Sequence, residues 1–255
     1  MPTAEGAALR PLTGAEELLV GEALAAGMPR AAIVTRLLAA VLDPGGEAQA
    51  LGLSVGQREA LLLRLRRTAF GDRIEAVAAC PRCREQLDIE LGTAELLGTG
   101  GDPPESVEAD IQADGASWRV RLRPVTGADQ TEALAAADPV AVLLRCCVTG
   151  LVRGDGVVWP VEQAGPALRA AIDTALRDAD PHAEIRLDLA CPGCRESFAV
   201  PFDAAGHFFA ELAAEADLLL REVAALARSF HWREQDILAL PRSRRKAYAA
   251  LAAAR

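Results

Sequence analysis

The sequence predicts an α+β protein that is predominantly α-helical and is built from two tandem homologous helical halves, each with a β-hairpin, plus a C-terminal helical extension. Three observations lead there. Hydrophobic residues make up 51% of the 255 positions but aromatic residues only 4%, which favours close-packed helices of Ala, Leu and Val. Two sequence patterns each occur twice, and alternating apolar residues flank two CxxC pairs.

The two copies match at two separate places. RPLTGAE at 10–16 matches RPVTGAD at 123–129, and ACPRCREQLDIEL at 79–91 matches ACPGCRESFAVPF at 190–202. The matches occur in the same order with nearly the same offset, so we predict an internal duplication. The predicted domains are a first repeat over 1–97, a linker over 98–105, a second repeat over 106–205 that begins with a β-hairpin, and a C-terminal helical extension over 206–255 with no counterpart in the first repeat.

Caps and apolar spacing predict the helices of each copy. Thr13 and Thr126 are expected as N-caps, because an acidic residue follows each of them three positions later, near the positive end of the helix dipole. Ser54, followed by Gln57, is expected to cap a helix that runs to about residue 67, and residues 166–176 take its place in the second copy. The apolar spacing of Ile33, Leu37, Ala40 and Val41 predicts one more helix.

Strands are predicted beside both CxxC pairs, from apolar residues at 87, 89 and 91 after Cys83 and at 185, 187 and 189 before Cys191. Each pair is therefore expected at a hairpin tip. A further hairpin is predicted over 107–111 and 118–122, with a turn near Gly115. Beyond the second copy, helical spacing from Phe208 to Phe230 predicts one long amphipathic helix, and Pro241 is expected to separate two shorter ones.

The four cysteines of the two pairs, Cys80, Cys83, Cys191 and Cys194, have the ligand spacing of zinc knuckles. One knuckle supplies half of a tetrahedral site, so we predict one structural Zn²⁺ per chain, shared by the two repeats. Redox chemistry of CxxC normally needs a following helix, whereas strand patterns follow here. Thiols without metal remain a second alternative. Cys146 and Cys147 are predicted as small helix residues in the core, with a further ligand pair as the alternative.

Composition and motifs argue against several classes of function. A net charge of −9 and a pI near 5.0 argue against general binding to nucleic acids or anionic membranes. The first residues include Glu5, Glu16 and Glu17 and resemble no secretory signal, and no run of 18 apolar residues occurs, so a cytoplasmic location without membrane contact is predicted. GLSVG around Ser54 lacks the preceding strand of a nucleophile elbow, and a four-cysteine zinc site is closed to substrates.

We therefore predict no enzymatic activity and no small-molecule substrate. The three histidines, His182, His207 and His231, form no metal-binding motif of the HExxH kind, and no P-loop or GxGxxG occurs. The basic cluster Arg242, Arg244, Arg245 and Lys246 is expected at a solvated or partner-facing helix end, with phosphate contact as the alternative.

Two segments resemble proteins of phage tails. FHWREQDILALP at 230–241, followed by basic residues and Tyr248, resembles a helical motif of small tail-assembly and baseplate-associated proteins of phages and phage-like contractile injection systems. LLLRLRRTAFGDRIEAVAACPRC at 61–83 is similar to a segment of the T4-type baseplate protein family. The resemblance implies a non-enzymatic baseplate component or assembly chaperone, with other baseplate or tail proteins as partners and a place in a tail-like particle.

A long helical extension suits docking to such a partner. The expected partner-binding residues are Phe208, Phe209, Trp232, Ile237, Leu240 and Tyr248. As an alternative, the same side chains fold the extension back onto the body. The alternative function is a zinc-ribbon nucleic-acid-binding or transcription-associated protein, although the hairpin tips offer no aromatic residues for stacking.

Overall fold

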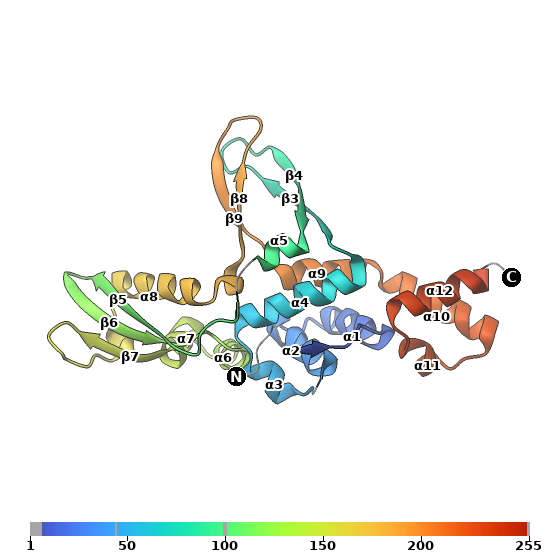
Figure 1. Cartoon of the computed structure of the whole chain (residues 1–255), viewed down its shortest axis with the longest axis horizontal. Helices are drawn as coiled ribbons and strands as arrows, with labels where there is room; N and C mark the ends of the chain where they lie inside the picture. Colours follow the sequence, from blue (N-terminus) through green and yellow to red (C-terminus); the bar gives the residue numbers. More distant parts are fainter. Residues whose placement is uncertain (1–6, 44, 99–100, 254–255) are drawn as a thin grey trace.

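The structure, a computed structural model, describes residues 7–43, 45–98 and 101–253 and has an elongated helical body from which two β-hairpins project (Figure 1). Residues 1–6 lie outside the described part; they include Glu5, one of the residues on which the prediction of no secretory signal rests. The helices are α1 Gly14–Ala25, α2 Arg30–Val41, α3 Glu47–Gly52, α4 Val55–Phe70, α5 Thr93–Leu97, α6 Gly127–Leu134, α7 Pro139–Cys147, α8 Pro166–Ala179, α9 Ala204–Ala214, α10 Ala216–Phe230, α11 Glu234–Leu238 and α12 Arg242–Ala253.

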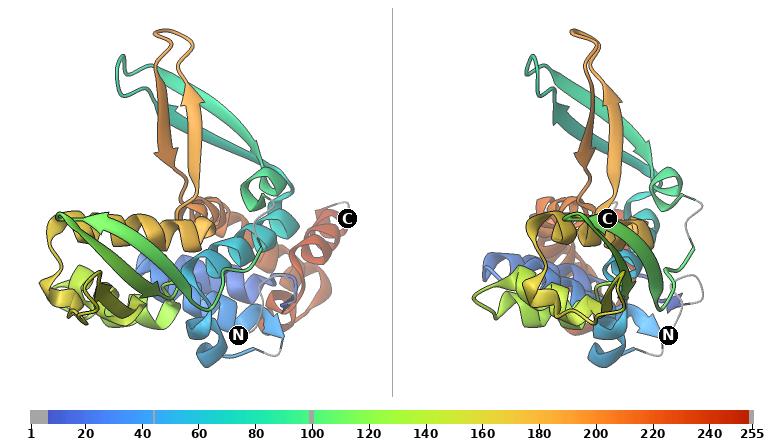
Figure 2. Two further views of the ribbon diagram at one scale, coloured as in Figure 1. Left: turned by 60° about the vertical axis from the view of Figure 1, so that its left-hand side comes forward. Right: turned by 90° about the vertical axis from the view of Figure 1, so that its left-hand side faces the viewer.

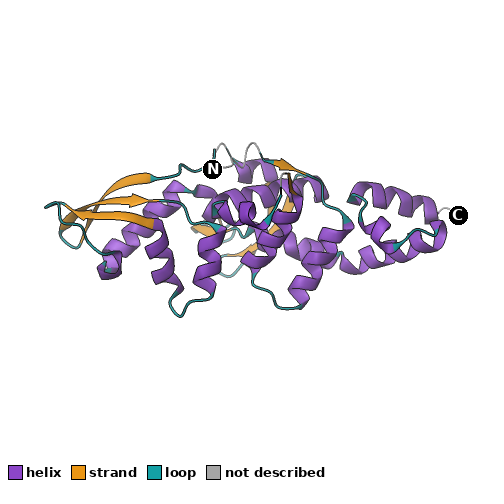
Figure 3. Cartoon of the chain, turned by 90° about the horizontal axis from the view of Figure 1, so that it is seen from below, coloured by secondary structure: helices purple, strands orange, loops and turns teal. Residues whose placement is uncertain are grey.

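The strands form small antiparallel sheets, which confirms the mixed and mostly helical class. They are β1 Ala8–Leu9, β2 Leu42–Asp43, β3 Arg73–Ala79, β4 Gln86–Gly92, β5 Val107–Ala113, β6 Ala116–Leu122, β7 Val148–Arg153, β8 Arg186–Ala190 and β9 Ser197–Pro201. Short 3₁₀ helices occupy Val161–Gln163 and Pro181–Glu184. Seen from below, the β5–β7 sheet lies at one end of the body and α10–α12 at the other (Figure 3).

The main hydrophobic core lies among α1, α2, α3, α4 and α9. Ser54 caps α4 as predicted, because its hydroxyl accepts a hydrogen bond from the backbone N–H of Gln57 at 3.1 Å. Helix α9 follows the second hairpin in sequence, yet it packs against the helices of the first half. Phe208 and Phe209, each 1% exposed, fill the space between them. The predicted boundary between residues 205 and 206 therefore falls inside α9.

A second core joins α7 and α8 to the three-stranded sheet β5–β6–β7. The β5–β6 hairpin was predicted, but β7 was not. Strand β7 pairs with β6 so that Leu151 lies opposite Val120. Its pattern is weak in the sequence because it follows α7 without a break and includes Gly150, a residue that strands disfavour.

The two RPxTGA segments make the same local contacts. Arg10 pairs with Glu16 at 2.7 Å, and Arg123 pairs with Asp129, also at 2.7 Å. In both cases the acidic side chain also accepts a hydrogen bond from the backbone N–H of the threonine three positions earlier, at 3.0 Å in the first segment and 2.8 Å in the second. This arrangement is the predicted capping box at the start of α1 and α6.

The single long helix predicted from Phe208 to Phe230 was wrong, because the chain breaks at Glu215 into α9 and α10. The break lets the two helices bury their apolar faces in different cores. Phe208 and Phe209 face the first half, whereas Leu219, Val223 and Leu226 pack with α11 and α12. The carboxylate of Glu215 contacts both Arg242 and Lys246.

The basic cluster at the start of α12 is not wholly solvated, contrary to the prediction. Arg245 is 1% exposed and donates to Glu17 at 2.9 Å and to Glu222 at 2.8 Å. Arg242 also donates to Glu17, at 2.8 Å. Two of the four basic residues therefore attach α12 to α1, and the exposed pair is Arg244 and Lys246. A buried arginine needs its donors paired, and one of the carboxylates that pair with Arg245, that of Glu17, lies more than 200 positions away in the sequence.

Candidate metal centre

Hairpins β3–β4 and β8–β9 project side by side from the same face of the body, and their tips meet (Figure 2). The predicted strand positions at both tips are confirmed. In the first hairpin Ala79 pairs with Gln86, and in the second Ala190 pairs with Ser197, so each CxxC turn starts one residue after the last pair. The register therefore places each cysteine pair in the turn at the tip of its hairpin.

The two CxxC turns have the same backbone geometry. In the first, the N–H of Cys80 donates to the carbonyl of Glu85 and the N–H of Arg84 donates to Cys80, both at 2.9 Å. The equivalent bonds of the second turn, also at 2.9 Å, run from Cys191 to Glu196 and from Arg195 to Cys191. Arg84 and Arg195 both have a left-handed backbone, with φ of 64° and 61°. Each turn therefore presents its two sulfur atoms in the same way.

All four sulfur atoms lie within 4.8 Å of one another. The Sγ atoms of Cys80 and Cys194 are 3.6 Å apart, and those of Cys83 and Cys191 are 3.5 Å apart. Zinc with four thiolates at about 2.3 Å requires neighbouring sulfur atoms roughly 3.8 Å apart. The cluster thus fits a tetrahedral metal ion with small adjustments, and each hairpin supplies half of the ligands.

Electrostatics in the cluster favour one thiolate and hold back another. A hydrogen bond from the backbone of Cys83 lowers the pKa of Cys80 to about 7. The backbone of Glu85 also lowers the pKa of Cys83, but the neighbouring thiols of Cys191 and Cys194 outweigh it and raise that pKa to about 12. Without a cation, four thiolates this close repel one another. A divalent ion would remove that repulsion.

The surroundings of the cysteines bear on the alternatives to a zinc site, namely redox chemistry at the CxxC pairs and a further ligand pair at Cys146 and Cys147. Each CxxC pair lies between two strands, whereas thiol–disulfide catalysis uses a pair at a helix N-terminus. The six cysteines are free. Cys146 and Cys147 lie far along the chain, at the end of α7; Cys147 is fully buried as predicted, and Cys146 is half-buried with its sulfur 3.8 Å from Glu132.

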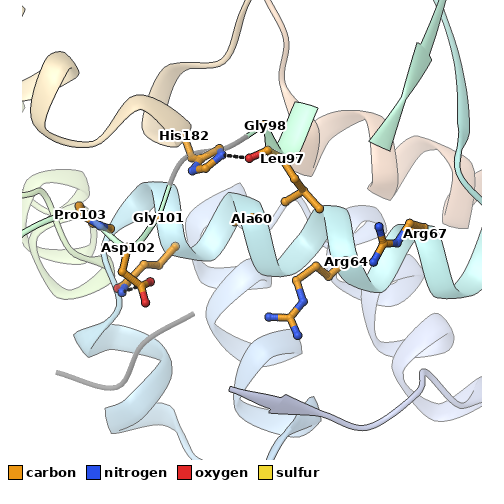
Figure 4. A pocket seen from close by; sticks show the side chains of 10 residues that line it. Ala60, Arg64, Arg67, Leu97, Gly98, Gly101, Asp102, Pro103 and His182 are labelled. Carbon is orange, nitrogen blue, oxygen red and sulfur yellow. Dashed lines mark hydrogen bonds between the residues drawn. The ribbon is translucent and has the colours of Figure 1, made fainter. Parts of the chain in front are cut away.

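A hollow of about 400 Å³ lies on α4 beside the linker (Figure 4). Arg64, Arg67 and His182 line it, and the His182 Nε2 is 2.7 Å from the carbonyl of Leu97. Asp102 accepts a hydrogen bond from Gln57. The Gln57–Asp102 bond joins the linker to α4, whereas the His182 contact joins the 3₁₀ helix Pro181–Glu184 to α5. Among the described residues that line the hollow, no nucleophile lies next to a base.

The residues expected to bind a partner lie in two environments. Phe208 and Phe209 belong to the main core and present no surface, and Ile237 is also fully buried. The remaining three, Trp232, Leu240 and Tyr248, are half-buried. Trp232 stacks on Phe230, with ring centres 5.0 Å apart, and meets Tyr248 edge-to-face at 4.9 Å. Phe208 and Phe209 pack on the body, as in the folded-back alternative, whereas Ile237, Trp232 and Tyr248 pack mainly within α10–α12. Partner binding through the half-buried residues stays a prediction.

Comparison with known proteins gives one match. No curated protein and no solved structure matches the chain. In the described part, no helix has the length and apolarity that crossing a membrane requires. The model of the family described as T4 bacteriophage base plate protein matches residues 3–210, which include both RPxTGA segments and both hairpins. The chain therefore belongs to the T4 bacteriophage base plate protein family.

Proposed function

We propose that this protein is a non-enzymatic subunit of the baseplate of a phage tail-like contractile particle. It acts either as a structural component or as an assembly factor with a chaperone-like role. The family match over residues 3–210 carries this proposal. It extends through the helical halves and the cysteine hairpins, so the family resemblance is not limited to one local motif. The proposed partners are other baseplate or tail proteins, met in the cytoplasm or within the particle.

We further propose that the four cysteines hold one structural Zn²⁺. The sulfur spacings of 3.5 and 3.6 Å across the two hairpins support this ion. Four protein ligands leave no position for substrate or activated water, which supports a structural role without catalysis. The ion would join two hairpins whose cysteines are 108 and 114 positions apart, and so limit the motion of one half relative to the other.

The internal duplication is part of the same proposal. It is supported by contacts that recur in the two halves. The N–H of Arg10 donates to the carbonyl of Val41, and the N–H of Arg123 donates to that of Cys147, both at 2.9 Å. The equal geometry of the two CxxC turns adds to this. On this proposal the halves have retained a common plan, and the zinc site uses one hairpin from each.

The zinc proposal is tested by native mass spectrometry of the full chain together with elemental analysis. We expect one zinc ion per chain. Cys191→Ser should lose it, whereas Cys146→Ser, a change of the same kind outside the cluster, should keep it. A correctly folded wild-type chain that carries no metal when purified with zinc present would overturn the proposal.

The baseplate role is tested in cells that produce the particle. Deletion of the gene should abolish complete contractile particles in electron micrographs, and the wild-type gene should restore them. Mass spectrometry of purified particles then shows whether the protein stays in the baseplate or leaves after assembly. Normal particles in the deletion strain would contradict the role, whatever the metal content.

A further inference from the structure

An open groove runs between α7 and α8 on the second half. It encloses about 500 Å³ and has Val140, Leu143, Leu144 and Leu176 among its apolar lining. Val140 is 61% exposed, and Leu143 and Leu176 are half-buried. Arg177 lies at its edge, where it pairs with Asp173 and contacts Glu184 at 3.6 Å.

The corresponding groove of the first half lies between α2 and α4 and is filled. Alignment of the RCCV end of α7 with the AAVL end of α2 places Val140 at Val34 and Leu143 at Leu37. Val34 is 3% exposed and Leu37 is fully buried. The same types of residue at the same positions are thus covered in one half and open in the other.

Helix α9 is the cover in the first half. Its residues Ala205, Phe208, Phe209 and Leu212 belong to one hydrophobic cluster with α2 and α4. The carboxylate of Glu211 accepts from Arg66 of α4 at 2.6 and 3.0 Å. The N–H of Ala205 donates to Glu59, also on α4, at 3.0 Å. A short amphipathic helix therefore fills this groove through two adjacent phenylalanines and one acidic residue.

The α8 side of the open groove matches the α4 residues that contact α9. Counting from the N-caps Ser54 and Gly165, the positions of Leu65 and Arg66 on α4 correspond to those of Leu176 and Arg177 on α8. The chain itself supplies no equivalent cover among its described residues. Helix α5, which follows the first hairpin as α9 follows the second, has five residues and packs on α4.

We infer that the α7–α8 groove binds an amphipathic helix of another subunit of the particle, one with two adjacent large apolar side chains and an acidic residue three positions after the first. The apolar pair would cover Val140, Leu143 and Leu176, and the carboxylate would pair with Arg177. A second copy of this chain is a poor source, because the apolar face of its own α9 is buried in the main core. The inference rests on the duplication and the baseplate role proposed above.

The test uses a labelled peptide with the sequence of residues 203–214 and fluorescence anisotropy on the full, zinc-loaded chain. We expect saturable binding. Val140→Glu and Leu176→Glu should weaken it about tenfold or more, because each places a charge in an apolar contact. Val158→Glu is the matched control at a residue 76% exposed outside the groove, and it should bind as the wild type does. A peptide with both phenylalanines replaced by alanine should not bind.

A photoreactive group at the first phenylalanine of the peptide gives an independent readout, since its crosslinks should fall in α7 and α8. Crosslinks confined to the first half, no saturable binding, or equal weakening by Val158→Glu would overturn the inference. Dimerisation of the free chain that Val140→Glu abolishes would also overturn it, in favour of a second copy. Because zinc content and particle assembly are measured separately, failure here is distinguishable from failure of the proposed function.

Discussion

The guanidinium of Arg58 lies directly against Gly127, so a Cβ at that glycine would overlap it. Arg58 is 2% exposed and donates to the carbonyl of Ala50 at 3.1 Å and to the hydroxyl of Thr35 at 2.9 Å. The first turn of α6 is thereby held on the start of α4, and the N–H of Gly127 donates to the carbonyl of Leu53 at 3.1 Å. This contact joins the two halves in the body, far from the cysteine cluster.

Gly127→Ala is therefore expected to destabilise the chain by about 1–3 kcal/mol, because the added methyl group must displace a buried arginine from its acceptors. Urea unfolding followed by circular dichroism measures the change. Gly21→Ala is the matched control, since a Cβ at Gly21 meets nothing within 4 Å and alanine favours a helix interior by about 0.5–1 kcal/mol. Equal effects of the two changes would contradict the role given to Arg58.

The same relationship recurs at the other end of the molecule. A Cβ at Gly14 would be 2.9 Å from the Arg245 Nη1, so the first turn of α1 is covered by α12 as that of α6 is covered by α4. The backbone contact also recurs: the N–H of Val55 donates to Val125 at 2.7 Å, and the N–H of Arg242 donates to Leu12 at 3.4 Å. The C-terminal helix α12 thus packs on the start of the first half in the same way that α4 of the first half packs on the start of α6 in the second.

Glu17→Gln should weaken the packing of α12 on α1. Glu17 is 6% exposed and accepts from both Arg242 and Arg245, so its neutralisation leaves two buried cations with less compensation and should cost about 2–4 kcal/mol. Hydrogen exchange should increase in α10–α12 before the rest of the chain unfolds. Glu22→Gln, at an exposed position of the same helix, should change stability by less than about 0.5 kcal/mol. Unchanged exchange in α10–α12 would count against the network.

Local patterns predicted the local structure well. The N-caps at Thr13 and Ser54 and the strands beside the cysteines follow from spacing along a few residues, and the structure has them. The approach of Cys80 to Cys194 could also be predicted from the sequence, because one CxxC pair supplies half of a tetrahedral site and a second pair must complete it. Such features depend on neighbouring residues or on the chemistry of one ion.

Features that depend on distant residues were not predictable in this way. Arginine is normally a surface residue, and Arg245 is buried only because Glu17 and Glu222 receive it. One signal was overlooked: residues 47–58 and 234–245 both have Glu, two leucines and a final Arg at the same spacing. That shared pattern gives the C-terminal extension a counterpart in the first half. It marks the helix pairs α3–α4 and α11–α12, whose final arginines are both buried, Arg58 against carbonyl and hydroxyl acceptors and Arg245 against carboxylates.

The Arg123–Asp129 pair predicts a pH dependence. Burial raises the pKa of Asp129, but hydrogen bonds from Arg123 and Thr126 outweigh it and lower the pKa from 3.8 to about 2. The ionised carboxylate therefore stabilises the fold above about pH 4, and this contribution is lost as the pH falls toward 2.

Asp129→Asn should cost about 1–2 kcal/mol at neutral pH, and the difference from wild type should shrink between about pH 4 and 2. The free energy of unfolding of the wild type is subtracted from that of the variant at each pH. This difference cancels the acid sensitivity of the cysteine cluster, which both proteins share. Asp178→Asn, at an exposed position of α8, should give a difference near zero at every pH. A constant difference for Asp129→Asn across this range would show that Arg123 does not control the ionisation.

The left-handed residues of the two CxxC turns give the last prediction. Arg84 has φ of 64°, a conformation that costs a residue with a Cβ roughly 1–2 kcal/mol and costs glycine nothing. Arg84→Gly should therefore stabilise the zinc-loaded chain by up to about 1 kcal/mol, reduced by the greater freedom of glycine in the unfolded chain. Arg82→Gly, in the same turn without a positive φ, should give no gain. Chemical unfolding at fixed zinc concentration measures both, and native mass spectrometry should find the metal retained. A loss of stability in Arg84→Gly equal to that in Arg82→Gly would show that the arginine side chain, and not its backbone, matters at this turn.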